Sequence, residues 1–258
     1  MKRFLPALMI LLFAATLSSA EVFKITNIKY GTTKIKATEK SSGTYLWHSQ
    51  TKDSKINYKG QVMVYSEETG GGTYDKKDQT WITKSFFTLD GTKMTPYQIT
   101  IVFKDKDGAV TQTVDKYYDQ QKKKIIGIVK DGSDKVKKSK EFDFKDDIVD
   151  TENLGTCLRN FPFEEKRDVY FNLLTDEPTL YGINMKYLGI ENLQVNGKEV
   201  PCYRLQMVVD LGALGIIGAF IPKTYFWYEV KPPHEFVRYE GLESGLGTPY
   251  IVREIVAD

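Results

Sequence analysis

The two histidines, His48 and His234, are the first residues to consider for chemistry in this 258-residue chain. Neither has a Cys, His or acidic neighbour at the spacing that metal ligands use. The sequence therefore predicts no metal site, and it offers no signature for a cofactor.

A nucleophile is equally hard to place. The segment Gly241–Gly245 (GLESG) carries its serine one position away from that of the G-x-S-x-G turn. The adjacent carboxylates Asp146-Asp147 and Glu164-Glu165 point apart on any regular element, and the sequence shows no phosphate-binding or dinucleotide-binding glycine pattern. We predict that the protein is not an enzyme, and we assign no catalytic residue.

Cys157 and Cys202 are the two cysteines of the chain. A bridge between them would close a loop of about 45 residues, worth roughly 4 kcal/mol in the chain-entropy model. If the chain reaches an oxidising compartment, such a bridge is favoured. We predict a Cys157–Cys202 disulfide, with two separate buried thiols as the alternative.

The first twenty residues have the layout of a secretory signal. A basic start (KR, residues 2–3) precedes an apolar run (residues 4–17) and a small-residue exit (SSA, residues 18–20). We predict that residues 1–20 are cleaved and that residues 21–258 form one domain in the periplasm or the medium. The alternative is an N-terminal membrane anchor. An anchor needs roughly 20 apolar residues, whereas the run from 4 to 17 offers about 14.

The charge balance argues against a nucleic-acid partner. Removing the two basic residues of the signal lowers Lys plus Arg from 36 to 34, which equals the 34 Asp plus Glu. A neutral chain lacks the electrostatic footprint of a nucleic-acid-binding protein. The runs Lys122–Lys124 and Lys135–Lys140 lie among Asp, Gly and Ser, which favours a lysine-guarded hairpin edge over a binding patch.

The rest of the chain reads as antiparallel strands. Dipeptides suited to two-residue hairpin turns lie between alternating segments, at Asp90-Gly91, Asp107-Gly108, Asp131-Gly132 and Asn196-Gly197. The clearest alternation of apolar and polar residues covers 97–104, 181–187 and 202–209. We expect further strands near 22–30, 33–39, 43–49, 60–66, 80–89, 110–118, 124–130, 167–174, 224–230, 235–240 and 250–256.

One segment has clear helix signals. Asp150–Asn160 begins with a capping residue and an acidic first turn, and it ends with a basic residue shortly before a proline. A single helix between two blocks of strands predicts a mainly β protein. We expect one curved antiparallel sheet, a half-open barrel with one or two short helices that cover its open side or one mouth.

The C-terminal part of the chain resembles a known family. After the helix ending Cys157-Leu158-Arg159 come Tyr187–Gln206 (YLGIENLQVNGKEVPCYRLQ) and Lys223–Gly241 (KTYFWYEVKPPHEFVRYEG). These segments are similar to the exported bacterial family called domain of unknown function 3108, and the similarity is clearest over about the last 100 residues. The resemblance implies a half-open barrel related to the lipoprotein carriers of the LolA and LolB type, whose hollow receives acyl chains.

The resemblance brings no catalytic residue. Arg159, Glu191 and Trp227 match the family pattern, and they imply an Arg–Glu pair that ties the helix to the sheet and an indole in the core.

The leading hypothesis is an exported, non-enzymatic protein that binds a lipid or acyl chain in the concave face of its sheet. Apolar burial alone can hold such a ligand. The residues predicted to bind it are Tyr97, Ile99, Ile101, Phe103, Tyr181, Ile183, Met185, Tyr187, Leu211, Leu214, Ile216, Ile217, Phe220 and Trp227. One alternative is that these faces form a dry packed core. Another is a structural or assembly partner in the cell envelope, acting through sheet edges or residues 211–221.

Residues 211–221 (LGALGIIGAFI) form an unusual apolar connection between two predicted strands. Connections normally face water, so eleven apolar residues need an explanation. We expect a loop folded over the mouth of the barrel. The alternatives are an apolar tip that touches a membrane or partner, and strand ends buried on both faces.

Overall fold

The computed structural model describes residues 22–195, 197–210 and 222–256, which we call the described chain. Its elements, in order, are β1 (Gly31–Glu39), β2 (Tyr45–Tyr58), β3 (Gln61–Tyr74), β4 (Lys77–Asp90), β5 (Lys93–Asp105), β6 (Val110–Asp119), β7 (Lys124–Asp131), β8 (Val136–Asp143), β9 (Ile148–Asp150), α1 (Thr151–Arg159), the 3₁₀ turn η1 (Phe163–Glu165), β10 (Val169–Leu174), β11 (Leu180–Val195), β12 (Lys198–Asp210), β13 (Thr224–Glu229), β14 (Phe236–Leu242) and β15 (Tyr250–Ile255). Within the described chain, no helix has both the length and the apolar character needed to cross a membrane.

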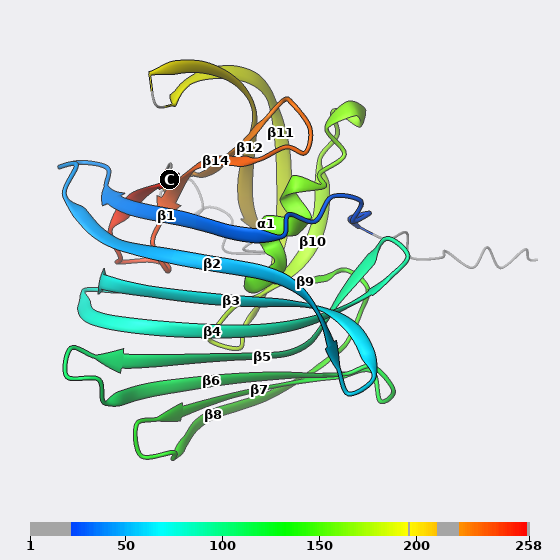
Figure 1. The fold of residues 1–258 in the computed structure, drawn as a ribbon, viewed down its shortest axis with the longest axis vertical. Coiled ribbons are helices and arrows are strands. Elements are labelled where there is room, and N and C mark those ends of the chain that lie inside the picture. Colours follow the sequence, from blue (N-terminus) through cyan, green and yellow to red (C-terminus); the bar gives the residue numbers. More distant parts are fainter. Residues whose placement is uncertain (1–21, 196, 211–221, 257–258) are drawn as a thin grey trace, which may run out of the picture.

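All fifteen strands belong to one sheet, in the order β8-β7-β6-β5-β4-β3-β2-β1-β15-β14-β13-β12-β11-β10-β9. Neighbours are antiparallel except for β9 and β10, which are parallel. Figure 1 shows β1 to β8 as a curved stack with α1 at the centre of the molecule, and the β11–β12 hairpin as an arc above it. The predicted fold class, a mainly β half-open barrel with short helices, is confirmed.

The two ends of the sheet meet through side chains rather than through strand pairing. Ile148 of β9 and Leu174 of β10 pack in one cluster with Val114 and Ile125 of β6 and β7. Pro178, in the β10–β11 turn, packs directly over Gly127 of β7. A Cβ added at Gly127 would lie 2.5 Å from the Pro178 ring, so this close approach requires glycine. The barrel is therefore closed on this side by packing.

Two clusters of buried side chains fill the concave side. One contains residues of β3–β7, β9 and β10, and the other joins α1 and the N-terminal segment to β1, β2, β4 and β9–β15. Between them, polar side chains face inward from β2, β3 and β4, including the buried Ser49, Thr83 and Ser85. Glu68 of β3 is one of these polar groups, and its carboxylate accepts the indole N–H of Trp81 (2.9 Å).

Most predicted elements are present, although β2 and β3 extend to Tyr58 and Tyr74, well beyond the predicted ranges 43–49 and 60–66. The helix begins after the predicted capping residue Asp150, whose side chain accepts from the backbone of Glu152. The predicted strand at 22–30 is wrong, because residues 23–30 have neither helix nor strand structure. The lysine run 135–140 belongs largely to β8, which is an edge strand of the sheet, as the lysine-guarded edge predicted.

Candidate functional site

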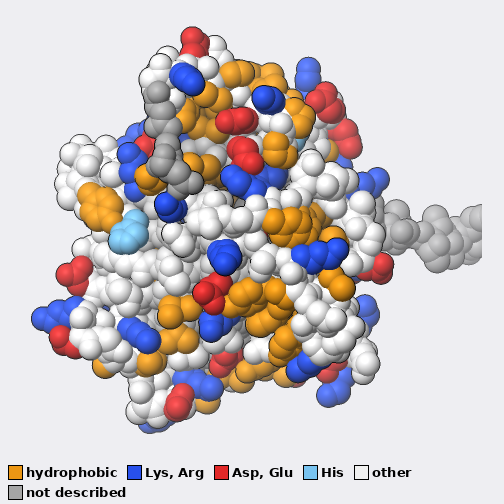
Figure 2. All heavy atoms as spheres, viewed as in Figure 1, with side chains coloured by type: hydrophobic (Ala, Val, Ile, Leu, Met, Phe, Trp, Pro, Cys, Tyr) orange, Lys and Arg blue, Asp and Glu red, His pale blue; other side chains and the backbone are white. Residues whose placement is uncertain are grey.

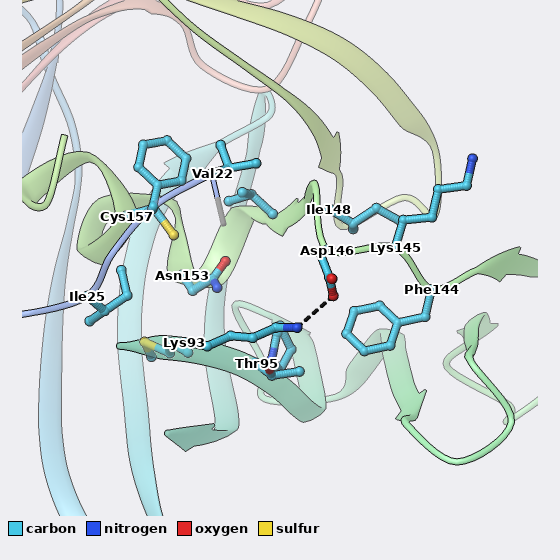
Figure 3. A pocket seen from close by; sticks show the side chains of 14 residues that line it. Val22, Ile25, Lys93, Thr95, Phe144, Lys145, Asp146, Ile148, Asn153 and Cys157 are labelled. Carbon is cyan, nitrogen blue, oxygen red and sulfur yellow. Dashed lines mark hydrogen bonds and ion pairs between the residues drawn. The ribbon is translucent and has the colours of Figure 1, made fainter. Parts of the chain in front are cut away.

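A small hollow with a mainly apolar lining lies where the two core clusters meet, beside Asn153 and Cys157 of α1. It is lined by side chains of the N-terminal segment, the start of β5, the segment that runs from the β8–β9 connection into β9, and α1: Val22, Phe23, Ile25, Lys93, Met94, Thr95, Pro96, Phe144, Lys145, Asp146, Ile148, Val149, Asn153 and Cys157. Figure 3 shows these side chains converging from four separate parts of the chain. The open space is about 40 Å³, little more than the volume of roughly 30 Å³ that one water occupies in the liquid.

The N-terminal segment, residues 22–28, closes one side of this hollow, and we call it the strap. Phe23 and Ile25 are only 6% and 4% exposed and belong to the larger core cluster. The Phe23 ring packs edge-on against Phe171 of β10, with 5.5 Å between the centroids. The strap therefore contributes apolar side chains to the core without being part of the sheet.

The backbone of the strap is held largely by one amide side chain. Asn160, the C-cap of α1, accepts from the N–H groups of Thr26 and Asn27, both at 2.8 Å, and donates to the carbonyl of Asn27 at 2.9 Å. Ile25 adds one backbone hydrogen bond to Thr92 in the β4–β5 turn (2.8 Å). Releasing the Asn160 amide would remove most of these backbone contacts.

The rim of the hollow carries an exposed ion pair. Lys93 at the start of β5 lies 2.6 Å from Asp146 in the β8–β9 connection, as the dashed line in Figure 3 marks. Both side chains are 43% exposed. An exposed pair of this kind contributes about 0–1 kcal/mol, so it does not lock the rim.

The N-terminal end of α1 is held by buried charge. Lys116 of β6 and Asp150 are both fully buried and lie 2.7 Å apart, and Lys116 also lies 3.3 Å from Asp176. Tyr118 donates its hydroxyl to the same Asp150 carboxylate. We call Lys116, Tyr118, Asp150 and Asp176 the latch, because they fasten the start of α1 to β6.

The latch perturbs the ionisation of its neighbours. Burial alone would lower the pKa of Lys116, but the carboxylates of Asp150 and Asp176 outweigh it and hold that pKa above its ordinary value. Burial, reinforced by the Asp176 carboxylate, raises the pKa of Glu152 well above its ordinary value. These groups form an ion-pair network, and within the described chain no group of three or more Asp, Glu, His or Cys side chains is arranged to hold a metal ion.

The predicted ligand residues fall into several groups. Ile99 and Ile101 lie in one core cluster and Ile183 and Met185 in the other, each at most 3% exposed. Phe103 and Tyr187 are partly buried against these clusters, and Tyr181 is 42% exposed. None of the nine predicted ligand residues in the described chain lines the hollow, so their role in binding stays a prediction.

Tyr97 does not share the face of Ile99 as its spacing suggested. The pairing of β4 and β5 shifts at this point, so that Phe86 pairs with Gln98 and Phe87 with Pro96. Such a bulge turns the extra residue out of the alternation. The ring of Tyr97 therefore lies 6.2 Å from that of Tyr58 on the outer face.

Trp227 also lies on the outer face. It is 3% exposed and packs with Cys202 and Val237 in a third cluster. Its indole N–H donates to Glu191 (2.7 Å), and Glu191 also pairs with Arg204 (3.0 Å). Glu191 thus pairs within the sheet, and the ion pair between the helix and the rest of the fold joins Arg159 to Glu235 (3.5 Å).

The predicted disulfide is absent, and both cysteines are free and buried. Cys157 belongs to the concave core cluster, whereas Cys202 belongs to the cluster on the outer face. The next residue of β12, Tyr203, returns to the concave cluster. The sheet therefore separates the two thiols, and a bridge between them cannot form in this fold.

The predicted residues Leu211, Leu214, Ile216, Ile217 and Phe220 lie outside the described residues, so the expected loop over the mouth stays a prediction. The sequence did not predict that residues 22–28 form the strap or that Asn160 holds it. The alternation of Phe23 and Ile25 was visible, but it led to a strand prediction. A side chain that caps a helix and also binds a distant segment leaves no pattern in the sequence.

The profile of a protein family of unknown function (DUF3108) matches residues 26–251. The chain belongs to this family. The match extends the resemblance from the C-terminal segments to nearly the whole described chain, and the family description assigns no activity. Among curated proteins, none matches the chain.

Two solved structures are similar to this member of the DUF3108 family. One is the hypothetical lipoprotein YmcC from Escherichia coli (K12), with 8% identity, coverage of 89% of each chain and a TM-score of 0.28. The other, from Bacteroides fragilis NCTC 9343, is described as an exported protein with a YmcC-like fold, with 9% identity, coverage of 90% of this chain and 97% of that one, and a TM-score of 0.33. We transfer no function from either.

Proposed function

We propose that this protein is an exported, non-enzymatic protein that binds one apolar chain, such as an acyl chain, at the hollow beside α1. The observation that carries the proposal is the construction of this site. Most of its wall is apolar side chains, with charged groups such as Lys93 and Asp146 at the rim, and one side of it is the strap, which is not part of the sheet. Residues 1–20, with the layout of a secretory signal, are the basis for export.

In this proposal the strap occupies the site until a ligand displaces it. The free space of about 40 Å³ is far too small for a ligand, because sites for small molecules measure about 300–1,000 Å³. Phe23 and Ile25 fill the adjoining volume with apolar groups. An acyl chain that took their place would bury its own methylenes, each worth about 0.8 kcal/mol, without leaving a void.

The holding contacts of the strap are compatible with exchange. They are a few hydrogen bonds, most of them to Asn160, each contributing about 0.5–1.5 kcal/mol net. Displacing the strap also exposes Phe23 and Ile25, at about 1.5–3 kcal/mol each, and an acyl chain offsets this cost by burying several methylenes in their place. The latch holds Asp150, which adjoins the lining residues Val149 and Asn153, and so keeps this part of the wall in place.

The partner hypothesis keeps a narrower basis. The edge strand β8 carries Lys137, Lys138 and Lys140, and lysines on an edge discourage pairing with another strand. An envelope partner would then contact residues 211–221. Charged substitutions at Ile216 and Ile217 test this, because they should abolish partner capture while leaving the melting temperature unchanged.

The proposed function is tested on protein purified from the compartment to which the cell exports it. Organic extraction followed by mass spectrometry should release close to one fatty acid or phospholipid per chain. Protein refolded from denaturant serves as the control and should yield none. A clean extract from the native protein would contradict the proposal.

A further inference from the structure

We propose a second binding site, on the outer face of the sheet beneath the β11–β12 hairpin, for a small amphipathic anion with a carboxylate or phosphate head. It shares no residue with the hollow beside α1. The lining residues come from β1, β11, β14 and β15: Lys36, Leu193, Gln194, Val195, Val237, Arg238, Glu254 and Ile255. The space between them is about 200 Å³.

The hairpin forms the roof of this site. β12 pairs with β13 only between Cys202 and Met207, so the far part of the β11–β12 hairpin extends beyond β13. Figure 1 shows this hairpin curling over the sheet, and its side chains Leu193, Val195 and Val200 pack against the cluster of Cys202, Trp227 and Val237. Gly189, with a φ of +108°, lies at a shift in the β11–β12 pairing and permits the bend.

The floor of the site is a row of charged and aromatic residues in register across the sheet. Lys36 pairs with Glu254, Glu254 with Arg238, Arg238 with Trp227, and Trp227 with Arg204. In Figure 2, hydrophobic, basic and acidic side chains intermingle over the upper part of the visible face, where Figure 1 draws β11, β12 and β14. The site therefore combines an aliphatic roof with a charged floor.

The two cations in the site leave hydrogen-bond donors free. Arg238 binds Glu240 through Nη2 (2.7 Å), but its Nη1 lies 3.7 Å from Glu254, and Lys36 lies 3.8 Å from the same carboxylate. Both of these distances exceed that of a hydrogen bond. The Nε of Arg238 is buried and has no hydrogen-bond partner in the described chain. An anion could accept from these donors without breaking the bond to Glu240.

Arg238 is also held in place before any ligand arrives. Its guanidinium lies 6.0 Å from the ring centroid of Trp227, and the guanidinium of Arg204 lies 5.4 Å from the same ring. The indole N–H of Trp227 donates to the Glu191 carboxylate, which fixes the ring in place. A guanidinium fixed in this way loses little freedom on binding, and its fork of donors matches a carboxylate or phosphate.

The size and lining of the site determine the class of ligand. The volume of about 200 Å³ is below that of a full-sized ligand pocket, which favours a short apolar body. Leu193, Val195, Val237 and Ile255 would cover that body, while Lys36 and Arg238 bind the head. The carboxylates of Glu254, which lines the site, and of Glu240, which pairs with Arg238, both oppose the head electrostatically.

The experiment is a titration of the protein with octanoate and, separately, with octyl phosphate. Binding is measured by calorimetry and by changes in the backbone amide chemical shifts. 1-Octanol serves as the neutral probe. Both anions should bind and shift residues of β1, β14 and β15, and the neutral probe should not. The stronger of the two anions identifies the head group. Arg238→Gln should weaken binding about tenfold or more, and Lys36→Gln repeats this test at a more exposed residue.

Glu254→Gln gives the test of opposite sign, because removing the competing charge should tighten anion binding several-fold. Lys52→Gln, on β2 and outside the site, is the matched control and should leave anion binding unchanged.

Met94→Trp, which fills the hollow beside α1, should leave anion binding at the outer site unaltered. Failure of the outer-site proposal is therefore separable from failure of the proposed function. Equal binding of the neutral probe, unchanged affinity in both Arg238→Gln and Lys36→Gln, or no tightening in Glu254→Gln would overturn the assignment.

Discussion

The two ends of α1 are held in opposite ways. Its N-terminus is fixed by the latch, a buried ion pair between Lys116 and Asp150 with Tyr118 as a second donor. Its C-terminus meets the strap through the side chain of Asn160 and a few hydrogen bonds. One end resists change because its groups cannot be left unpaired away from water, whereas the other can exchange its partners for solvent or a ligand.

This difference teaches where the molecule can open. Displacing the strap exposes apolar surface that another apolar chain can cover, and the polar groups that it frees can bind water. Opening the latch would strand charges in the interior. A binding site is therefore expected between the strap, which can be displaced, and the part of α1 that the latch holds rigid.

The largest effect is expected at the latch. Lys116→Met should lower the free energy of unfolding by about 3–5 kcal/mol, because it leaves the buried Asp150 carboxylate without its cation. Urea unfolding followed by tryptophan fluorescence measures this. Lys52→Met, at an exposed lysine of β2, is the control and should change stability by less than about 0.5 kcal/mol. Equal losses in the two variants would show that the latch does not fix α1.

A substitution that releases the strap should have a smaller effect on the free energy of unfolding but a large effect on local amide exchange. Asn160→Ala should cost about 1–2 kcal/mol, because several hydrogen bonds are lost where water can replace them. Amide exchange of residues 25–28 should speed up far more than that of β5 or β6. Asn160→Asp keeps the acceptor oxygen and should protect Thr26 and Asn27 in part. Uniform acceleration across the sheet would contradict a separately held strap.

Glu152 should affect stability in the opposite direction. The folded state holds its proton more tightly than the unfolded state, whose pKa is near 4.5. Its contribution to stability is therefore present below that pH and is lost as the pH rises through the higher folded pKa. Glu152→Gln should thus raise stability at neutral pH by about 1 kcal/mol, or roughly 2–4 °C in Tm, and flatten the pH dependence. A variant less stable at neutral pH would contradict this.

The thiols of Cys157 and Cys202 should be unreactive in the folded protein. Burial raises the pKa of Cys157 to about 12 and that of Cys202 to about 11. At pH 8 both should resist a thiol reagent, and both should react once the chain is unfolded without a reductant. Two reactive thiols per unfolded chain are expected, with no change in stability on adding a reductant. A count of zero would restore the disulfide.

Much of the fold could be predicted because its signals are local. Alternation identified the strands, and Asp150 marked the start of α1. The same alternation set Cys202 apart from Tyr203, so the pattern already held the reason why a bridge to the concave core fails. The outward turn of Tyr97 could not be predicted, because a bulge depends on how two strands pair.

The sites could not be predicted for a related reason. The hollow combines residues from four parts of the chain that are distant in sequence, and no spacing links Phe23 to Met94 or Cys157. The row from Lys36 to Arg204 depends on β1 pairing with β15, which joins the two ends of the chain. Neighbour relations of this kind arise from the folded sheet and not from any one segment.

The most direct test is equilibrium binding of hexadecanoate to delipidated protein that carries Arg238→Gln, which weakens the outer anion site, measured by calorimetry with no further change, with Asn160→Ala and with Met94→Trp. One site is expected in the protein with Arg238→Gln alone, with tighter binding when Asn160→Ala frees the strap and loss of binding when Met94→Trp fills the hollow. Unchanged affinity across the three proteins, or no binding to any of them, would contradict the proposed function.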